Sequence, residues 1–101
     1  LSAAYKITGP EAEAALLTHA DVLECAVIGI ADAERGQIVQ AHVVLAEGTT
    51  PDADTAKRLQ DHVKATIAPY KYPRSVKFTT ALPKTQTGKI QRFLLRNQGQ
   101  S

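Results

Sequence analysis

The chain has 101 residues, 44% of them hydrophobic but only 5% aromatic, so we expect one small domain with an aliphatic core. No apolar stretch approaches the ~20 residues that span a bilayer, which predicts a soluble domain without a membrane contact. The chain begins with Leu1 and lacks the features of a signal peptide, so we expect a piece excised from a longer cytoplasmic protein. The single cysteine, Cys25, lies in the apolar run of residues 22–30 and is predicted to be a core residue.

The net charge of +2 conceals a division of charge along the sequence. Residues 1–61 hold all ten acidic residues and four of the twelve basic ones, so their net charge is −6. Residues 62–101 hold the other eight basic residues and no acid, so their net charge is +8. A basic region of this kind can attract an anionic ligand. A basic surface that only faces water is the equally weighted alternative.

The first predicted element is a helix over residues 8–19. Thr8 can cap it, Glu11 lies three residues further on as in a capping box, and Pro10 tolerates the first turn because it needs no amide donor there. Two strands are expected next. Residues 22–30 are apolar on both faces, as in a buried strand, and residues 38–45 alternate between apolar and polar. With a short polar connector, they predict an antiparallel pair.

The second half of the chain predicts a helix, a short strand and a final short helix. Apolar residues recur at helical spacing over residues 54–67, after a loop that ends in acids suited to start a helix. Pro69 and Pro73 exclude a helix from the next stretch. Residues 75–80 predict a strand and residues 90–96 a last helix. The expected fold is therefore α+β: a small antiparallel or mixed sheet of about three strands, with helices packed on it.

A loop that carries a lysine after a glycine is expected between the last strand and the last helix. Residues 82–90 read Leu-Pro-Lys-Thr-Gln-Thr-Gly-Lys-Ile. This is not a P-loop, because a proline stands in place of that motif's first glycine and isoleucine follows the lysine. Lys89 remains, a compact charge suited to phosphate or carboxylate oxygens, on a loop that Thr85, Thr87 and Gly88 can hold in a defined shape. A surface lysine without a catalytic role is the alternative.

Aromatic and basic residues alternate in the segment Tyr70-Lys71-Tyr72-Pro73-Arg74. Such a segment can stack a purine and bind phosphates, as single-stranded nucleic-acid binders do. In the alternative interpretation, both tyrosines pack on the core and the basic residues face water.

The three histidines, His19, His42 and His62, are scattered and lack metal-ligand spacing, so we expect them at the surface or at helix ends. We expect no metal site. No Ser-His-Asp or paired-carboxylate arrangement can be argued from the sequence.

The sequence of residues 82–92, Leu-Pro-Lys-Thr-x-Thr-Gly-Lys-Ile-x-Arg, resembles the closing motif of the adenylate-forming superfamily. Acyl-CoA synthetases, peptide-synthetase adenylation domains and luciferases belong to that superfamily. Residues 2–13 resemble the segment that opens its C-terminal domain, and residues 19–44 follow in the same order. The resemblance covers residues 2–96. It implies the C-terminal subdomain of an acyl- or aryl-CoA synthetase, whose large N-terminal domain, in the same chain, is absent here.

The resemblance implies a role for Lys89 in a two-step reaction. A small carboxylic acid and ATP form an acyl-adenylate and pyrophosphate, and the acyl group then passes to the thiol of CoA. In the first step Lys89 reaches the carboxylate and the α-phosphate and offsets their charge; the domain then rotates for the second. Mg²⁺ accompanies ATP in the full enzyme and is not bound by this domain. No nucleic acid is expected as a partner.

The resemblance also assigns residues to CoA. Tyr70, Tyr72 and Arg74 match positions that contact its adenine and phosphates in relatives, and Lys64 and Arg35 match positions used similarly in some members. This assignment agrees with the positive charge of the second half of the chain.

The resemblance further bears on the pantetheine arm of CoA and on the acid. Ala4 stands where relatives usually have glycine, beside the pantetheine path, so its methyl group narrows that path or the backbone shifts. Residues 68–74 and 88–93 look most like benzoate-type and medium-chain synthetases, and residues 7–13 resemble 2-aminobenzoate-CoA ligases. The alternatives are a peptide-synthetase subdomain that serves a carrier protein, or a free-standing module that binds nucleotides or single-stranded nucleic acid.

Overall fold

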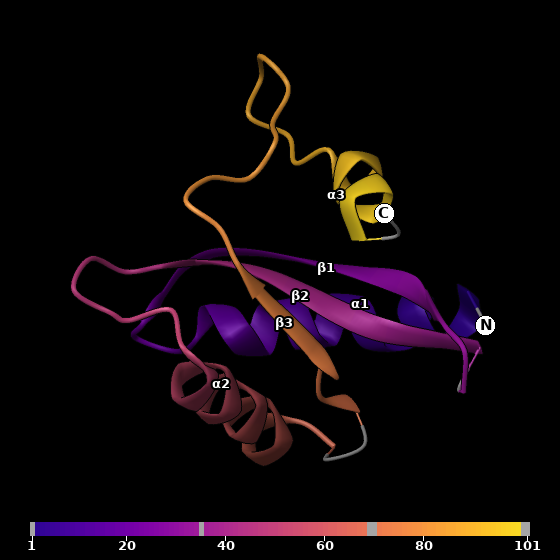
Figure 1. Ribbon diagram of the computed structural model, residues 1–101, viewed down its shortest axis with the longest axis horizontal. Coiled ribbons are helices and arrows are strands. Elements are labelled where there is room, and N and C mark those ends of the chain that lie inside the picture. Colours follow the sequence, from indigo (N-terminus) through magenta and orange to yellow (C-terminus); the bar gives the residue numbers. More distant parts are fainter. Residues whose placement is uncertain (1, 35, 69–70, 100–101) are drawn as a thin grey trace.

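Figure 1 shows the computed structural model of the chain, which describes residues 2–34, 36–68 and 71–99. The elements follow in the order α1 (Ser2–Leu17), β1 (Val22–Asp32), β2 (Gly36–Leu45), α2 (Ala53–Thr66), β3 (Ser75–Phe78) and α3 (Arg92–Gly99). The strands lie in the order β1-β2-β3, with β2 antiparallel to β1 and parallel to β3. The predicted α+β fold with a small mixed sheet is confirmed.

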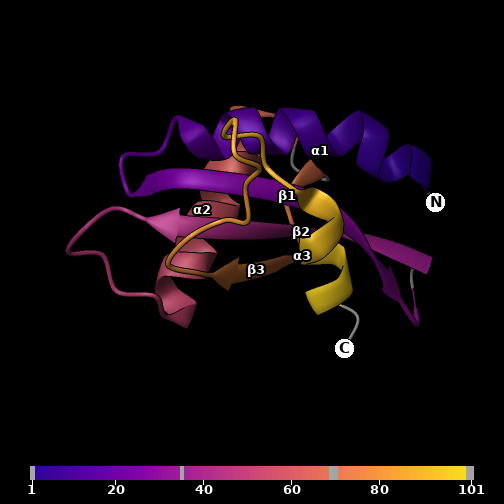
Figure 2. The same ribbon diagram turned by 90° about the horizontal axis from the view of Figure 1, so that it is seen from above.

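Helices α1 and α2 cover one face of the sheet, and α3 lies on the other (Figures 1 and 2). Side chains alternate between the faces along a strand, so the odd-numbered residues from Cys25 to Val27 and from Val39 to Val43 face α1 and α2. The buried core on this face consists of Ala12, Ala15, Leu16, Val22, Cys25, Val27, Val39, Ala41, Val43, Leu59 and Val63.

A second, smaller core lies between the sheet and α3. Its buried residues are Ala26, Ile28, Ile30, Val44, Leu82 and Leu95. Leu82 lies before residues 83–91 and Leu95 lies after them, in α3. This core therefore anchors the chain on both sides of residues 83–91. The two cores also explain why β1 is apolar on both faces.

The predicted start of the first helix at Thr8 is wrong. Helix α1 begins at Ser2, and Pro10 lies inside it rather than in its first turn. A proline removes one amide donor from a helix but does not force the chain to end there. The buried residues Ala12, Ala15 and Leu16 hold the part of the helix that follows Pro10 on the sheet.

The other elements lie where they are predicted, with small differences at their ends. Helix α2 begins after Asp52, whose carboxylate accepts the Thr55 amide at 2.9 Å. The first two strands run on to Asp32 and from Gly36, because backbone pairing continues past the apolar residues. The last strand ends at Phe78, and the last helix begins at Arg92.

Candidate functional site

Lys89 lies on a hairpin between β3 and α3, which we call the lysine hairpin and define as residues 84–90. Its two arms meet in an antiparallel bridge between Lys84 and Ile90, and the Gln91 amide donates to the Pro83 carbonyl at 2.9 Å just below that bridge. In Figure 1 the segment rises away from the sheet before it returns to α3. The hairpin therefore presents the exposed Lys89 well outside the core.

Thr85 holds the backbone on both sides of the turn. Its amide donates to the Lys89 carbonyl at 2.8 Å, and its carbonyl accepts the Gly88 amide at 2.9 Å. Its hydroxyl accepts the Lys89 amide at 3.1 Å and lies 3.0 Å from the hydroxyl of Thr87. Gly88 has φ +90°, a conformation that residues with a Cβ rarely adopt. The hairpin thus has a defined turn, with Lys89 fixed at the backbone.

Two of the three basic residues on and beside the hairpin are paired with acids. Lys84 forms an ion pair with Glu24 of β1, and Arg92 pairs with Glu13 of α1. Among the described residues, no carboxylate forms an ion pair with Lys89. The charge of Lys89 is therefore available to an anion from outside the domain.

A second group of functional candidates surrounds Tyr72. The Nζ atom of Lys64, in the last turn of α2, lies 4.3 Å from the centre of the Tyr72 ring. The Cζ atom of Arg74 lies 5.0 Å from the same centre, and its Nη1 donates to the Tyr72 hydroxyl at 3.0 Å. The ring is half-buried against the first core. The fold thus brings together three of the predicted CoA residues, which we call the Tyr72 cluster: Lys64, Tyr72 and Arg74.

The structure places the Tyr72 cluster and the lysine hairpin on different sides of the sheet. Helix α2, which carries Lys64, lies below the sheet in Figure 1, whereas the hairpin rises above it. Tyr72 packs on the core and Arg74 is exposed, whereas Lys71 is only 15% exposed and pairs with Glu11 of α1. Tyr70 and Arg35 lie outside the described residues. Ala4 lies in the first turns of α1, and its side chain is outside the description.

Cys25 is a buried thiol, as predicted. Its Sγ lies 3.5 Å from the Glu13 carbonyl oxygen, which it approaches as a donor. Burial raises the pKa of Cys25 to about 12; the Glu13 carboxylate raises it as well, and Arg92 opposes this. The thiolate is therefore not formed near neutral pH, which excludes Cys25 as a nucleophile.

The prediction that all histidines lie at the surface or at helix ends is wrong for His42, which is only 3% exposed. It lies on β2, the central strand, where both faces are covered, and its Nε2 lies 2.8 Å from the Gln40 Oε1. Burial lowers the pKa of His42, and the nearby Lys77 lowers it further. His19 and His62 do lie beside helix ends or on a helix surface, with their rings 4.9 Å apart at right angles. No group of acidic, histidine and cysteine side chains suited to a metal occurs among the described residues.

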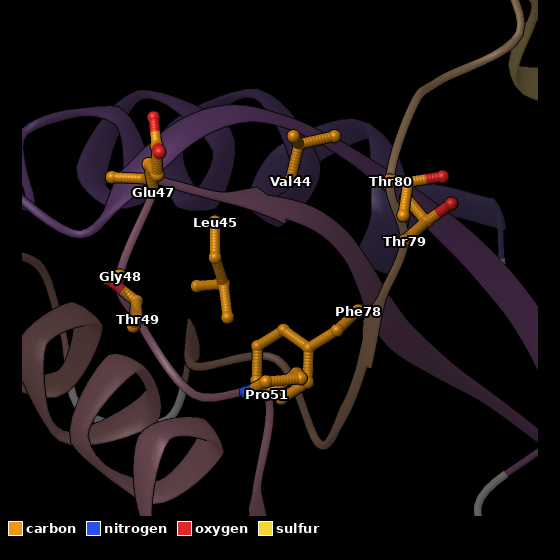
Figure 3. Close-up of a pocket in the computed structure, with 10 residues that line it drawn as sticks. Val44, Leu45, Glu47, Gly48, Thr49, Pro51, Phe78, Thr79 and Thr80 are labelled. Atoms are coloured by element: carbon orange, nitrogen blue, oxygen red, sulfur yellow. The ribbon is translucent and has the colours of Figure 1, made fainter.

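A pocket of about 400 Å³ opens beside the ends of β2 and β3 (Figure 3). Leu45, Pro51 and Phe78 point toward one another in it, and Glu47 supplies its charged group. In Figure 3 the Glu47 carboxylate points away from these three apolar side chains. Within the described part of the chain, no helix is long and apolar enough to cross a membrane.

Residues 11–89 match the family model described as AMP-binding enzyme C-terminal domain. This chain belongs to that family. The AMP-binding C-terminal domain is 50% identical over 101 residues to human acyl-coenzyme A synthetase ACSM4, mitochondrial, and this match covers 97% of the chain and 17% of the relative. The chain thus spans about a sixth of the length of that relative.

Solved structures of acyl- and aryl-CoA enzymes contain the same fold. The domain resembles an acyl-CoA synthetase from Brucella canis with a TM-score of 0.86 and 44% identity, over 92% of this chain and 18% of that one. For a benzoate CoA ligase from Burkholderia xenovorans LB400, the TM-score is 0.80 and the identity 45%, over 87% of this chain and 18% of that one. For the anthranilate CoA ligase AuaEII in complex with anthranoyl-AMP, the TM-score is 0.81 and the identity 42%, over 89% of this chain and 17% of that one.

Sequence reasoning assigned no role to Glu13 and Glu24, the acids that pair with Arg92, just after the lysine hairpin, and with Lys84, its first residue. Glu13 and Arg92 are 79 positions apart, so no local pattern reveals their contact. The only signal was the complementary charge of the two halves of the chain. The structure uses that charge directly, because Glu11, Glu13 and Glu24 of the acidic half pair with Lys71, Arg92 and Lys84 of the basic half.

Proposed function

We propose that this AMP-binding C-terminal domain belongs to an ATP-dependent carboxylate–CoA ligase and that Lys89 is its adenylation lysine. One observation carries the proposal: a folded hairpin holds Lys89 exposed, and no carboxylate of the described residues neutralises it. Membership of the family supports the same role. A large N-terminal domain of the same protein supplies the acid pocket and most contacts to ATP and its Mg²⁺.

In the adenylation step, Lys89 reaches into the active site of the large domain and contacts the carboxylate and the α-phosphate. Negative charge concentrates on these oxygens as the new bond forms, and the ammonium group offsets it without transferring a proton. The exposed hairpin suits this role because its tip is free to enter a site outside the domain. The small domain then rotates, withdraws Lys89 and brings another surface to the active site.

We assign CoA to the Tyr72 cluster. The Tyr72 ring offers a stacking surface for adenine, while Lys64 and Arg74 provide charges for the phosphates within 5.0 Å of the ring centre. Tyr70 and Arg35 complete the site by resemblance, and Ala4 borders the pantetheine path. Because the cluster and the hairpin lie on different sides of the sheet, one orientation of the domain serves each step.

The test is Lys89→Ala in the full-length protein. We expect pyrophosphate release to fall by roughly a hundredfold or more, as for the loss of one electrostatic donor. Thioester formation from supplied acyl-adenylate and CoA should remain. Lys57→Ala is the control for pyrophosphate release, because Lys57 is a highly exposed lysine on α2, on the other side of the sheet from the hairpin; it shares Asp61 with Lys64 of the Tyr72 cluster. Equal loss of both half-reactions in the Lys89→Ala enzyme would overturn the assignment.

For the acid, we propose an aromatic substrate of the benzoate or 2-aminobenzoate type. The similarity to the benzoate and anthranilate CoA ligases supports this choice. Pyrophosphate release by the full-length protein with benzoate, 2-aminobenzoate and medium-chain acids tests it, and preference for a medium-chain acid would refute it. We also propose a cytoplasmic location, which fractionation of the source cells tests.

A further inference from the structure

Two ion pairs hold the base of the lysine hairpin, one at each end. Lys84 begins the hairpin and pairs with Glu24 of β1. Arg92 follows the hairpin as the first residue of α3 and pairs with Glu13 of α1. The two ion pairs thus connect the base of the hairpin to strand β1 and to helix α1.

The Glu13–Arg92 pair has the geometry of a rigid joint. The Arg92 Nη2 lies 2.6 Å from Glu13 Oε1, and its Nε lies 3.3 Å from Oε2, so two nitrogens of the guanidinium face two oxygens of the carboxylate. Glu13 Oε2 also accepts the Val27 amide of β1 at 2.9 Å. The Glu13 side chain is only 19% exposed, and its carboxylate therefore connects three elements: α1, β1 and α3.

The Lys84–Glu24 pair restrains the other arm. Both side chains are about one-third exposed, and Lys84 also forms the backbone bridge to Ile90. Below the bridge, Leu82 and Leu95 are buried in the second core. The base of the hairpin is therefore fixed in two ways. Leu82 and Leu95 pack in the second core, and an ion pair restrains the chain on each side of the hairpin.

We infer that Glu13 and Glu24 are positioning residues, which set the direction in which Lys89 leaves the domain through Arg92 and Lys84. This inference rests on the proposed function of Lys89. The Lys84–Glu24 pair is about one-third exposed and contributes little to global stability, whereas the less exposed, bidentate Glu13–Arg92 pair contributes more. Both pairs limit the tilt of the hairpin, and a displacement of about 1 Å at a reacting group can cost on the order of a hundredfold in rate. Precision of the adenylation step is the role that we assign to the two glutamates.

The variants that test this inference are Glu13→Gln, Glu24→Gln and the double variant, each in the full-length protein. Glutamine keeps the length of glutamate, and at position 13 it keeps a carbonyl oxygen for the Val27 amide. The substitutions therefore remove the charge and spare the backbone contact. The matched control is Asp21→Asn, because Asp21 forms a similar ion pair between elements, 3.2 Å from Arg58, away from the hairpin.

Two measurements separate positioning from a merely structural role. Pyrophosphate release should fall by about tenfold in each single variant and by about a hundredfold in the double variant, in kcat rather than KM. Thioester formation from supplied acyl-adenylate and CoA should keep its rate in all variants. Hydrogen exchange at the amides of Thr85, Gly88 and Lys89 should rise in the glutamine variants and stay unchanged in Asp21→Asn. Thermal unfolding should change as little in Glu24→Gln as in Asp21→Asn, because both remove a partly exposed ion pair.

Unchanged exchange in the hairpin would overturn the inference, because the hairpin would then be rigid without the ion pairs. So would a loosened hairpin with undiminished pyrophosphate release, or an equal loss of both half-reactions. The proposed function fails by a different result, since it requires Lys89→Ala to lose pyrophosphate release while the hairpin and its ion pairs stay intact.

Discussion

Gly88→Ala isolates the contribution of the hairpin turn to the placement of Lys89. Gly88 has φ +90°, and a Cβ built on it has no heavy atom within 4 Å outside its chain neighbours. The substitution therefore introduces no collision, and its whole effect comes from forcing an L-residue into a left-handed conformation. This strain costs roughly 1–2 kcal/mol.

The strain acts on a turn whose bonds are local. Relief requires only the bonds between Thr85 and its partners Gly88 and Lys89 to rearrange, and these residues are exposed. If the native turn is depopulated by this energy, the fraction of correctly placed Lys89 falls by roughly fivefold to thirtyfold. Pyrophosphate release in the full-length protein should decrease by the same factor, and thioester formation from supplied acyl-adenylate should not.

Gly48→Ala is the matched control, because Gly48 has φ +91° and equally open space at its Cβ. It lies in the turn after β2, so its strain should lower stability without an effect on pyrophosphate release. Thermal unfolding and both half-reactions are measured for the two variants. An equal effect of both substitutions on pyrophosphate release, or none for Gly88→Ala, would refute the view that the turn places Lys89.

Two further predictions concern the Tyr72 cluster and the buried histidine. Tyr72→Leu should raise the KM for CoA by about tenfold, the scale of one lost base–aromatic stack, and leave pyrophosphate release intact. Phe78→Leu is the control, because it alters an aromatic residue on the same core. An unchanged KM for CoA in Tyr72→Leu would contradict the CoA assignment. The pKa of His42 is lowered in the folded state. The stability that neutral His42 provides is therefore complete above pH 6.5, the ordinary pKa of histidine, and is lost as the pH falls through the lowered pKa of the folded protein. Thermal unfolding of the chain between pH 8 and 5 should therefore show a fall on acidification that is smaller in His42→Gln, and equal curves for both proteins contradict the role of His42.

The sequence allowed prediction of the elements that depend on local periodicity. The alternation over β2 and the helical spacing over α2 are confirmed, because each element buries one regular set of side chains. The start of α1 was wrong because the capping signal at Thr8 is only local, and the helix runs from Ser2 through that position with Pro10 inside it. His42 was misplaced for a similar reason, since only the position of β2 at the centre of the sheet buries it.

The charge division shows most clearly what the fold adds to the sequence. From the charge of the sequence alone, each of the eight basic residues of the second half is an equally good candidate for binding an anion. The fold separates them, because Lys71, Lys84 and Arg92 pair with glutamates of the first half, whereas Lys89 and Arg74 form no ion pair among the described residues. Ion pairing thus marks Lys71, Lys84 and Arg92 as structural joints and leaves Lys89 and Arg74 for ligands, while Lys64 of the Tyr72 cluster lies 3.8 Å from Asp61. This division favours Lys89 over Lys84, five residues earlier on the same hairpin, as the lysine that meets the carboxylate and the phosphate.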